Sequence, residues 1–128
     1  VDYRDWHVPL GRRFRALKLW WVLRSYGAEG LRHHIREHIR MAKELTQRLE
    51  VDDRFRLVAP TDFALVSFSH VDGDTATQGI ADAINDSGKA MVTTSRINDQ
   101  TFVRVSIGQT RTEQRHVDEL WEMICDFA

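Results

Sequence analysis

Three residues in the first half of the sequence have the types and the spacing of a zinc site. His34, Glu37 and His38 match the H-x-x-E-H pattern, in which two histidines bind Zn²⁺ and the glutamate activates a water molecule. A catalytic zinc ion also needs a third protein ligand and a cleft, and no second helix offers an obvious partner. We therefore predict no metal at these residues, which are typical of a partly solvated helix flank. A small zinc hydrolase remains a hypothesis that stoichiometric metal in the purified protein would support.

The other residues that could do chemistry do not form a complete active site. Cys125 has no histidine near it in the sequence, so we expect an inert, semi-buried thiol rather than a nucleophile. No serine lies in a G-x-S-x-G pattern, and no Walker-type or dinucleotide-binding glycine pattern occurs. The amines available for Schiff-base chemistry are Lys18, Lys43 and Lys89, and nothing around them in the sequence points to that chemistry.

A basic and aromatic run at residues 11–21 resembles a nucleic-acid or membrane-surface element. Seven of the eight residues 16–23 are apolar, however, and they surround a helix instead of forming one face. The run is also too short to cross a bilayer, which takes about 20 apolar residues. We therefore predict no nucleic acid and no membrane as partners. We expect an uncovered apolar patch that makes the chain self-associate or bind another protein.

Two helices are expected in the first half of the chain. Residues 14–26 form the first, which ends at Gly27 in a left-handed conformation. Residues 28–49 form the second and longer one, because apolar side chains recur there at spacings of three and four. That stripe consists of Leu31, Ile35, His38, Ile39, Ala42, Leu45 and Leu49. Residues 1–13 are expected to be irregular, because Pro9 and Gly11 disfavour a helix.

Beyond Asp52 the pattern changes to short strands and helices. The predicted strands are residues 55–59, 63–70, 91–97 and 101–107, the last two joined as a hairpin around Asn98 and Asp99. The predicted helices are one that starts at Asp72 or Asp74 and ends at Gly88, and one capped by Thr112 with Val117, Leu120, Trp121 and Ile124 on one face. This order predicts an α+β fold, a small antiparallel sheet with helices on one face, preceded by two helices.

Length and charge limit the possible functions. The chain has 128 residues, the size of one ordinary domain, and a net charge of -1 from 18 Lys and Arg against 19 Asp and Glu. The charge is uneven, with a basic first half up to Arg56 and an acidic remainder. A single cysteine forms no internal disulfide, which favours a reducing compartment. The chain begins at Val1 without an initiator methionine, so we expect a piece of a longer protein.

The first 45 residues carry the densest motif in the chain. Residues 2–20 read DYRDWHVPLGRRFRALKLW, which resembles a signature of the pyridoxal-phosphate-dependent group II decarboxylases, closest to the aromatic L-amino-acid decarboxylase branch. Residues 24–27 and 35–38 continue the match, and residues 107–121 are similar to the closing strand and helix of that family. The resemblance covers the whole chain but only the C-terminal quarter of the family's protein.

The resemblance implies a fragment of a larger enzyme of the aspartate-aminotransferase-type fold. Residues 1–26 would end the large cofactor domain, residues 27–50 would form a connecting helix, and residues 51–128 would form the small α+β domain. The implied parent is a cytoplasmic dimer that binds pyridoxal 5'-phosphate and releases CO₂ from amino acids, aromatic ones above all. Its cofactor lysine, in a His-Lys dipeptide, lies upstream of the signature, so the fragment alone is expected to be inactive and to bind no cofactor.

The same resemblance assigns roles to a few residues. Leu10 and Gly11 match positions that face the substrate pocket, and Asp2, Tyr3 and Arg4 would lie at the foot of the catalytic loop. No catalytic residue and no metal ligand is expected within the fragment. Its partners would be the rest of its own chain, a second identical subunit and the small amino-acid substrate. The alternative is a free-standing α+β interaction module that docks a partner through its basic N-terminal half.

Overall fold

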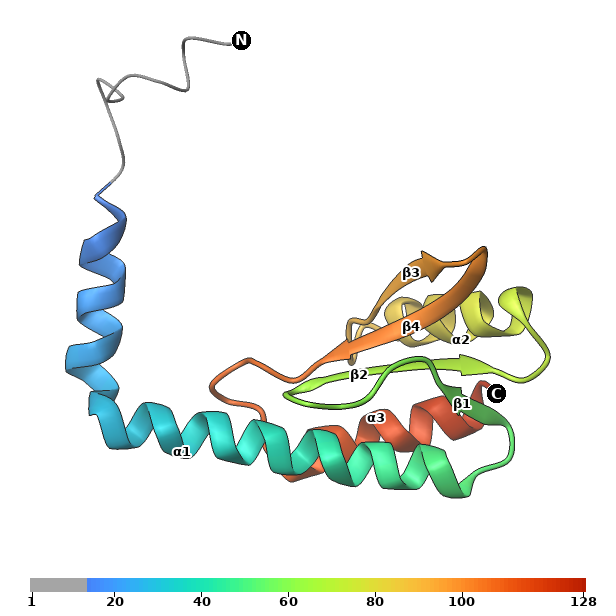
Figure 1. Cartoon of the computed structure of the whole chain (residues 1–128), viewed down its shortest axis with the longest axis horizontal. Coiled ribbons are helices and arrows are strands. Elements are labelled where there is room, and N and C mark those ends of the chain that lie inside the picture. Colours follow the sequence, from blue (N-terminus) through green and yellow to red (C-terminus); the bar gives the residue numbers. More distant parts are fainter. Residues whose placement is uncertain (1–13) are drawn as a thin grey trace, which may run out of the picture. The chain divides into compact units, whose positions relative to one another are not determined.

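The computed structural model describes residues 14–128, and its contacts divide the chain into two units, residues 1–32 and 33–128. The described part of the first unit is helical and belongs to α1 (Arg15–Val51), which continues into the second unit (Figure 1). The helical path is interrupted at Gly27, where φ is 65° and ψ is 173°. A positive φ is accessible to glycine at little cost, which is why the break falls there. The predicted end at Gly27 is confirmed, although its ψ is extended and not that of a left-handed helix.

The apolar side chains of residues 14–26 remain largely exposed. Leu19 is 61% exposed and Trp21 60%, and the two neighbouring indoles, Trp20 and Trp21, meet edge to face with ring centroids 5.0 Å apart. As far as residues 14–128 are concerned, the predicted exposure of this apolar helix is confirmed. Within residues 14–128, no helix is long and apolar enough to cross a membrane.

The second unit is built on a four-stranded antiparallel sheet. Its strands are β1 (Phe55–Leu57), β2 (Leu65–His70), β3 (Thr93–Ile97) and β4 (Gln100–Ser106), in the order β1-β2-β4-β3. Two further helices, α2 (Asp74–Asp86) and α3 (Gln114–Asp126), complete the unit. The predicted α+β fold is confirmed. The strands β1, β2 and β3 are each two residues shorter than predicted, whereas β4 has the predicted length but begins one residue earlier, at Gln100.

The hairpin between β3 and β4 turns where the sequence predicts it. Ile97 pairs with Gln100, so the loop consists of Asn98 and Asp99, with φ values of 48° and 60°. Two-residue hairpin turns with positive φ at both positions match the twist of the strands, and Asn and Asp tolerate that conformation better than most residues do. Local chemistry therefore fixes the register of this hairpin.

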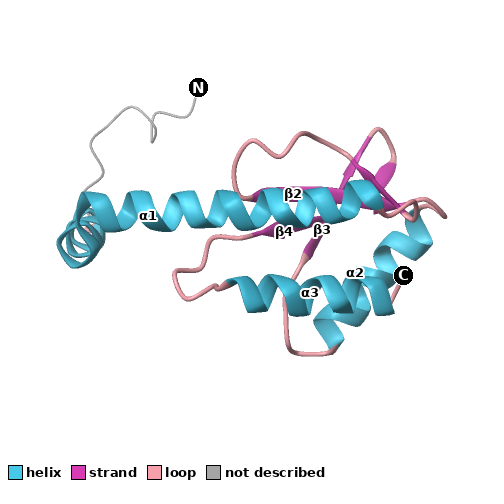
Figure 2. Ribbon diagram, turned by 90° about the horizontal axis from the view of Figure 1, so that it is seen from below, coloured by secondary structure: helices cyan, strands magenta, loops and turns pink. Residues whose placement is uncertain are grey.

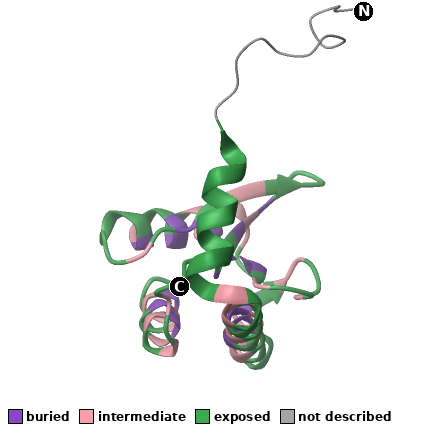
Figure 3. Ribbon diagram, turned by 90° about the vertical axis from the view of Figure 1, so that its left-hand side faces the viewer, coloured by how far each residue is buried: buried purple, intermediate pink, exposed green. Residues whose placement is uncertain are grey.

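The hydrophobic core lies between one face of the sheet and the three helices. Val66 and Phe68 of β2 pair in register with Val105 and Val103 of β4, and all four side chains are buried. The helices contribute Met41, Ala42, Leu45, Leu49, Ile80, Ala81, Ile84, Val117, Leu120 and Ile124 to the same cluster. In Figure 2, α1 and α3 lie side by side in front of the strands. Figure 3 shows buried residues on both of these helices. The helices therefore cover one face of the sheet, as predicted.

The predicted apolar stripe of α1 is only partly buried. Ile35 is 55% exposed, whereas His38, Leu45 and Leu49 are buried and Met41, which the stripe omitted, is also in the core. The burial begins at His38 because the sheet and α3 pack on α1 from there onward. Spacing alone could not show where along the helix the neighbouring elements begin.

Both predicted N-caps in the second unit are wrong by one residue. Gly73 precedes α2, and the Asp74 carboxylate instead accepts hydrogen bonds from the backbone N–H and the hydroxyl of Thr101, at 2.9 and 3.0 Å. Glu113, not Thr112, caps α3 in a reciprocal arrangement with His116, whose Nδ1 accepts from the Glu113 N–H at 2.9 Å. A contact across the fold thus engages the first residue of α2, whereas the start of α3 is fixed by a local pair three residues apart.

Candidate functional site

The residues with predicted functional roles lie outside the described part of the chain. Asp2, Tyr3 and Arg4, predicted at the foot of a catalytic loop, and Leu10 and Gly11, predicted to face a substrate pocket, belong to residues 1–13. Their roles stay predictions. The domain boundaries predicted at residues 26 and 50 also stay predictions.

The H-x-x-E-H residues lie on α1 but do not form a metal centre. The rings of His34 and His38 are 6.3 Å apart between centroids, and both line a cavity of about 300 Å³ beside residues 110–114. The Glu37 carboxylate accepts a hydrogen bond from Arg40 Nε at 3.0 Å, so an arginine already balances its charge. Over residues 14–128, no group of three or more His, Cys, Asp or Glu side chains could hold a metal ion. The structure gives the zinc-hydrolase hypothesis no ligand set.

Cys125 lies near the end of α3 and is half-buried. Burial raises the pKa of its thiol, although the nearby Arg54 acts in the opposite direction. A raised pKa favours the neutral thiol, and the thiolate is the nucleophile. The prediction of an inert thiol therefore agrees with its surroundings.

The face of the sheet opposite the helices carries two arginines among small hydroxyl side chains. Arg104 of β4 lies beside Ser67 of β2, and Arg56 of β1 lies beside Ser69. Both arginines are exposed, and neither has a salt bridge to any described residue. An arginine without a carboxylate partner can bind a carboxylate or a phosphate through two parallel hydrogen bonds. We missed this face in the sequence, although the alternation of polar and buried residues in residues 101–107 contains the signal.

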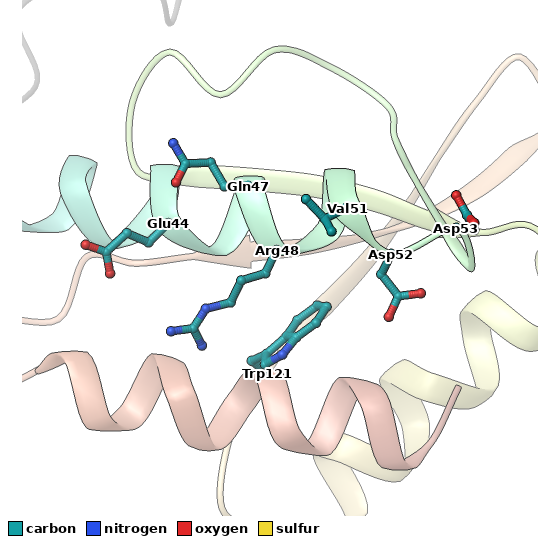
Figure 4. A pocket seen from close by; sticks show the side chains of 7 residues that line it. All are labelled: Glu44, Gln47, Arg48, Val51, Asp52, Asp53 and Trp121. Atoms are coloured by element: carbon teal, nitrogen blue, oxygen red, sulfur yellow. The ribbon is translucent and has the colours of Figure 1, made fainter.

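A groove of about 810 Å³ runs between α1 and α3 (Figure 4). It is lined by Glu44, Gln47, Arg48, Val51, Asp52, Asp53 and Trp121. Arg48 links the two helices through a salt bridge of 2.6 Å to Asp118. The Trp121 ring packs edge to face on Phe55, with centroids 6.1 Å apart.

Asp52 is fixed at one end of this groove. Its two carboxylate oxygens accept hydrogen bonds from Arg54 Nε at 3.0 Å and Nη2 at 2.8 Å. These bonds hold the pKa of Asp52 below its ordinary value. Arg54 also donates to the backbone carbonyl of Cys125 at 3.1 Å, so the chain after α1 is tied to the end of α3. Hydrogen bonds and an ion pair therefore hold this end of the groove in a fixed position.

A comparison with models of protein families identifies the family of this chain. Residues 1–71 match the model described as the pyridoxal-dependent decarboxylase conserved domain. The chain belongs to this family.

Individual relatives align with the entire chain. The phenylacetaldehyde synthase of Arabidopsis thaliana is 44% identical and tryptophan decarboxylase 2 of Oryza sativa 41% identical, each over 100% of this chain. The alignments cover 28% and 27% of those two proteins. The chain thus spans little more than a quarter of the length of these relatives.

Solved structures of the family have the same fold. The structure of Oryza sativa tryptophan decarboxylase with PLP and tryptamine superimposes on 99% of this chain with a TM-score of 0.85 and 36% identity. The structure of Rhodiola rosea 4-hydroxyphenylacetaldehyde synthase superimposes on 100% of this chain with a TM-score of 0.82 and 39% identity. The three helices and the four-stranded sheet therefore have the fold of the corresponding part of these proteins, the aspartate-aminotransferase-type fold, which confirms the predicted fold class.

The described residues do not fit pyridoxal phosphate. The cofactor needs a lysine for its imine and a cavity, and sites for ligands of this size usually exceed about 300 Å³. Lys18 and Lys43 are exposed on α1. Lys89 lies at a pocket of about 160 Å³ whose other walls include Val105, Ile107 and Leu120. None of these three lysines therefore has the surroundings of a cofactor lysine.

Proposed function

We propose that this chain is the C-terminal part of a pyridoxal-phosphate-dependent decarboxylase that releases CO₂ from aromatic L-amino acids and yields the corresponding amines. The observation that carries the proposal is the alignment of this entire chain with a part of tryptophan decarboxylase 2 of Oryza sativa, at 41% identity. The likeness to the rice enzyme's structure with PLP and tryptamine supports it. Pyridoxal phosphate supplies an electron sink for the cleaved bond, and we expect its lysine on the remainder of the protein.

In this proposal the chain supplies shape and positioning, not the cofactor site. The remainder of the enzyme covers what this chain leaves open, namely the apolar surface of residues 14–26 and the sheet face that carries Arg56 and Arg104. The two arginines suit a surface with carboxylate or phosphate groups because they have no acidic partner among residues 14–128. Leu10 and Gly11 would face the substrate, and residues 2–4 would support the mobile loop.

The test uses the intact protein encoded by the complete reading frame. Purified with pyridoxal phosphate, it should convert L-tryptophan, L-tyrosine or L-phenylalanine to the amine with release of one CO₂ per amine. A variant of the lysine in the upstream His-Lys dipeptide should lose both the activity and the imine absorbance. An intact protein that binds the cofactor but releases no CO₂ from any of the three substrates would contradict the proposal.

A second candidate activity is the formation of aromatic aldehydes. It is favoured by the 44% identity to the phenylacetaldehyde synthase of Arabidopsis thaliana. The same assay separates the two, because aldehyde formation releases CO₂ and ammonia and consumes O₂ and water with formation of hydrogen peroxide, whereas amine formation releases CO₂ and needs no oxidant. Amine without oxygen uptake supports the decarboxylase, and aldehyde with oxygen uptake supports the synthase.

We further propose that the intact enzyme is a cytoplasmic dimer of identical subunits. The free, half-buried Cys125 suits a reducing compartment, and the exposed apolar side chains of residues 14–26 need a covering surface. Light scattering on the intact protein should give twice the subunit mass. Fractionation of the source cells should recover the protein with soluble cytoplasmic markers, and recovery in an organelle would refute the location.

A further inference from the structure

A small pocket lies where the segment between α2 and β3 meets the end of β4 and the first turns of α3. We call it the Lys89 pocket. Residues from the segments 89–91, 105–107 and 112–123 line it, and its volume is about 160 Å³. All of these segments belong to the unit of residues 33–128. None of these residues has an assigned part in the proposed decarboxylase reaction.

The buried side chains that line the Lys89 pocket form an apolar floor. They are Val105, Ile107, Val117 and Leu120, and each of the four is at most 7% exposed. A cavity of about 150 Å³ is large enough to hold one benzene molecule. The floor therefore has room for a short aliphatic group and favours one over a polar group.

Two side chains of opposite charge line the same pocket. Lys89 is positive and Glu119 is negative, and both are exposed. Within residues 14–128, neither side chain forms a salt bridge or a hydrogen bond. The Ser106 and Thr112 hydroxyls, which also line the pocket, have no hydrogen-bond partner among the same residues. The described part of the chain thus leaves one charge of each sign available at this pocket.

His116 adds a hydrogen-bond donor to the lining. Its Nδ1 accepts a hydrogen bond from the Glu113 N–H at 2.9 Å, so the neutral ring carries its hydrogen on Nε2. That nitrogen can donate to a carboxylate, as can the Lys89 ammonium group and the Thr112 hydroxyl. The lining therefore offers several donors for a carboxylate and one carboxylate, that of Glu119, for a cationic group.

Both walls of the pocket are held in place before a ligand binds. The Asn85 side chain accepts a hydrogen bond from the Val92 N–H at 2.8 Å and donates one to the Val92 carbonyl at 3.1 Å, which closes residues 86–91 into a loop. On the other wall, the reciprocal pair of Glu113 and His116 holds the first turn of α3. A site that is already ordered loses less entropy when a ligand binds.

We propose that the Lys89 pocket binds a short aliphatic α-amino acid in its zwitterionic form. The carboxylate of the ligand pairs with Lys89, its ammonium group pairs with Glu119, and its side chain packs on the apolar floor. A ligand with a single charge would leave the opposite charge of the pocket without a partner, which disfavours it relative to the zwitterion. The proposal does not rest on the decarboxylase activity, because it involves only the residues of this pocket.

The test compares three related molecules by ligand-detected saturation-transfer NMR on the full chain. L-Valine has both charged groups, isovalerate lacks the ammonium group, and isobutylamine lacks the carboxylate. We expect L-valine to bind at least about tenfold more tightly than either of the other two. Equal binding of the three molecules, or no saturable binding of L-valine up to about 50 mM, would overturn the proposal.

Matched variants decide whether the Lys89 pocket is the site. Lys89→Gln should weaken L-valine binding by about tenfold, so that L-valine and isobutylamine bind alike. Glu119→Gln should likewise reduce the binding of L-valine to that of isovalerate. The controls Lys43→Gln and Glu122→Gln make the same charge changes outside the pocket and should leave the binding within about twofold.

All four of these side chains are exposed, so the variants should keep the fold, which circular dichroism checks. L-Valine binding that survives both pocket variants shows that the ligand lies elsewhere. Equal weakening by the pocket variants and the controls shows attraction by net charge alone. Either result refutes the proposed site.

Discussion

Helix α1 presents the same residue type in two opposite environments. Leu19, in the unit of residues 1–32, is 61% exposed, whereas Leu45, in the unit of residues 33–128, is 0% exposed. Both residues lie on helical turns, so helix formation itself does not distinguish them. The difference is that Leu45 faces a sheet and α3 supplied by the same chain, while residues 14–128 supply no such cover at Leu19. Apolar sequence therefore indicates a need for burial, and only the neighbouring elements satisfy it.

The largest expected effect is on the free energy of unfolding, when a leucine is truncated to alanine in each of these two environments. Leu45→Ala should lower the free energy of unfolding by about 2–5 kcal/mol, because it leaves a cavity in the core. Leu19→Ala should change it by less than about 0.5 kcal/mol, because the side chain is exposed. Urea denaturation followed by circular dichroism measures both. Similar losses for the two variants would mean that residues 14–26 pack as firmly as the core.

The exposed indoles of the first unit give the next prediction. Light scattering should show a dimer or a larger species for the chain alone, because an uncovered apolar patch favours association. Trp20→Glu with Trp21→Glu should weaken that association by about tenfold or more, since each places a charge in the contact. A stable monomer of the unchanged chain at all concentrations would contradict the prediction. Glu29→Gln, on the same helix, is the control and should leave the mass unchanged.

A smaller effect is expected at the joint between α2 and β4. The hydrogen bond from the Thr101 N–H holds the pKa of Asp74 below its ordinary value, with further contributions from the Thr101 hydroxyl and the charge of Arg96. The ionised carboxylate therefore stabilises the folded state above the unfolded pKa, and this stabilisation is lost as the pH falls through the lower folded value.

Asp74→Asn tests this joint. It should lower the urea midpoint at pH 7 and reduce the further loss between about pH 4 and pH 2, near and below the ordinary pKa of aspartate. The control is Asp86→Asn, at the exposed end of the same helix. If both variants keep the pH dependence of the unchanged chain, Asp74 does not contribute as described.

The smallest expected effect is at the start of α3. His116→Ala removes the acceptor of the Glu113 N–H and should cost about 1 kcal/mol, a typical value for a lost helix cap. Glu119→Ala, an exposed change on the same helix, should cost less than about 0.5 kcal/mol. Urea denaturation separates the two, and equal costs would indicate that the cap contributes nothing.

Several elements could be predicted from the sequence because their causes are local. The break at Gly27 and the turn at Asn98 and Asp99 follow from residues that tolerate positive φ. The apolar faces of α2 and α3 follow from helical spacing. The cap of α2 could not be predicted, because Asp74 is engaged by Thr101, a residue 27 positions away in the chain. Competition between local and distant partners decides such positions.

The candidate sites divide in the same way. The motif in residues 2–20 predicted the family that the comparison confirms, and this needed no structure. The H-x-x-E-H pattern predicted a zinc site only as a hypothesis, and the pairing of Glu37 with Arg40 shows why the pattern alone is weak. The open arginine face and the groove between α1 and α3 each combine residues from separate elements, so the alternation in residues 101–107 indicated only one strand of the arginine face and no local pattern indicated the groove.

The sequence by itself determined that the chain is a fragment-sized α+β unit of a known enzyme family. Motifs and periodicity depend only on the order of the residues along the chain. The tertiary structure alone decided which apolar residues are buried, which carboxylates are paired, and which residues of α1 and α3 line one groove. The physical reason is that burial and pairing depend on distances in space. Those distances are set when elements far apart in the chain pack together.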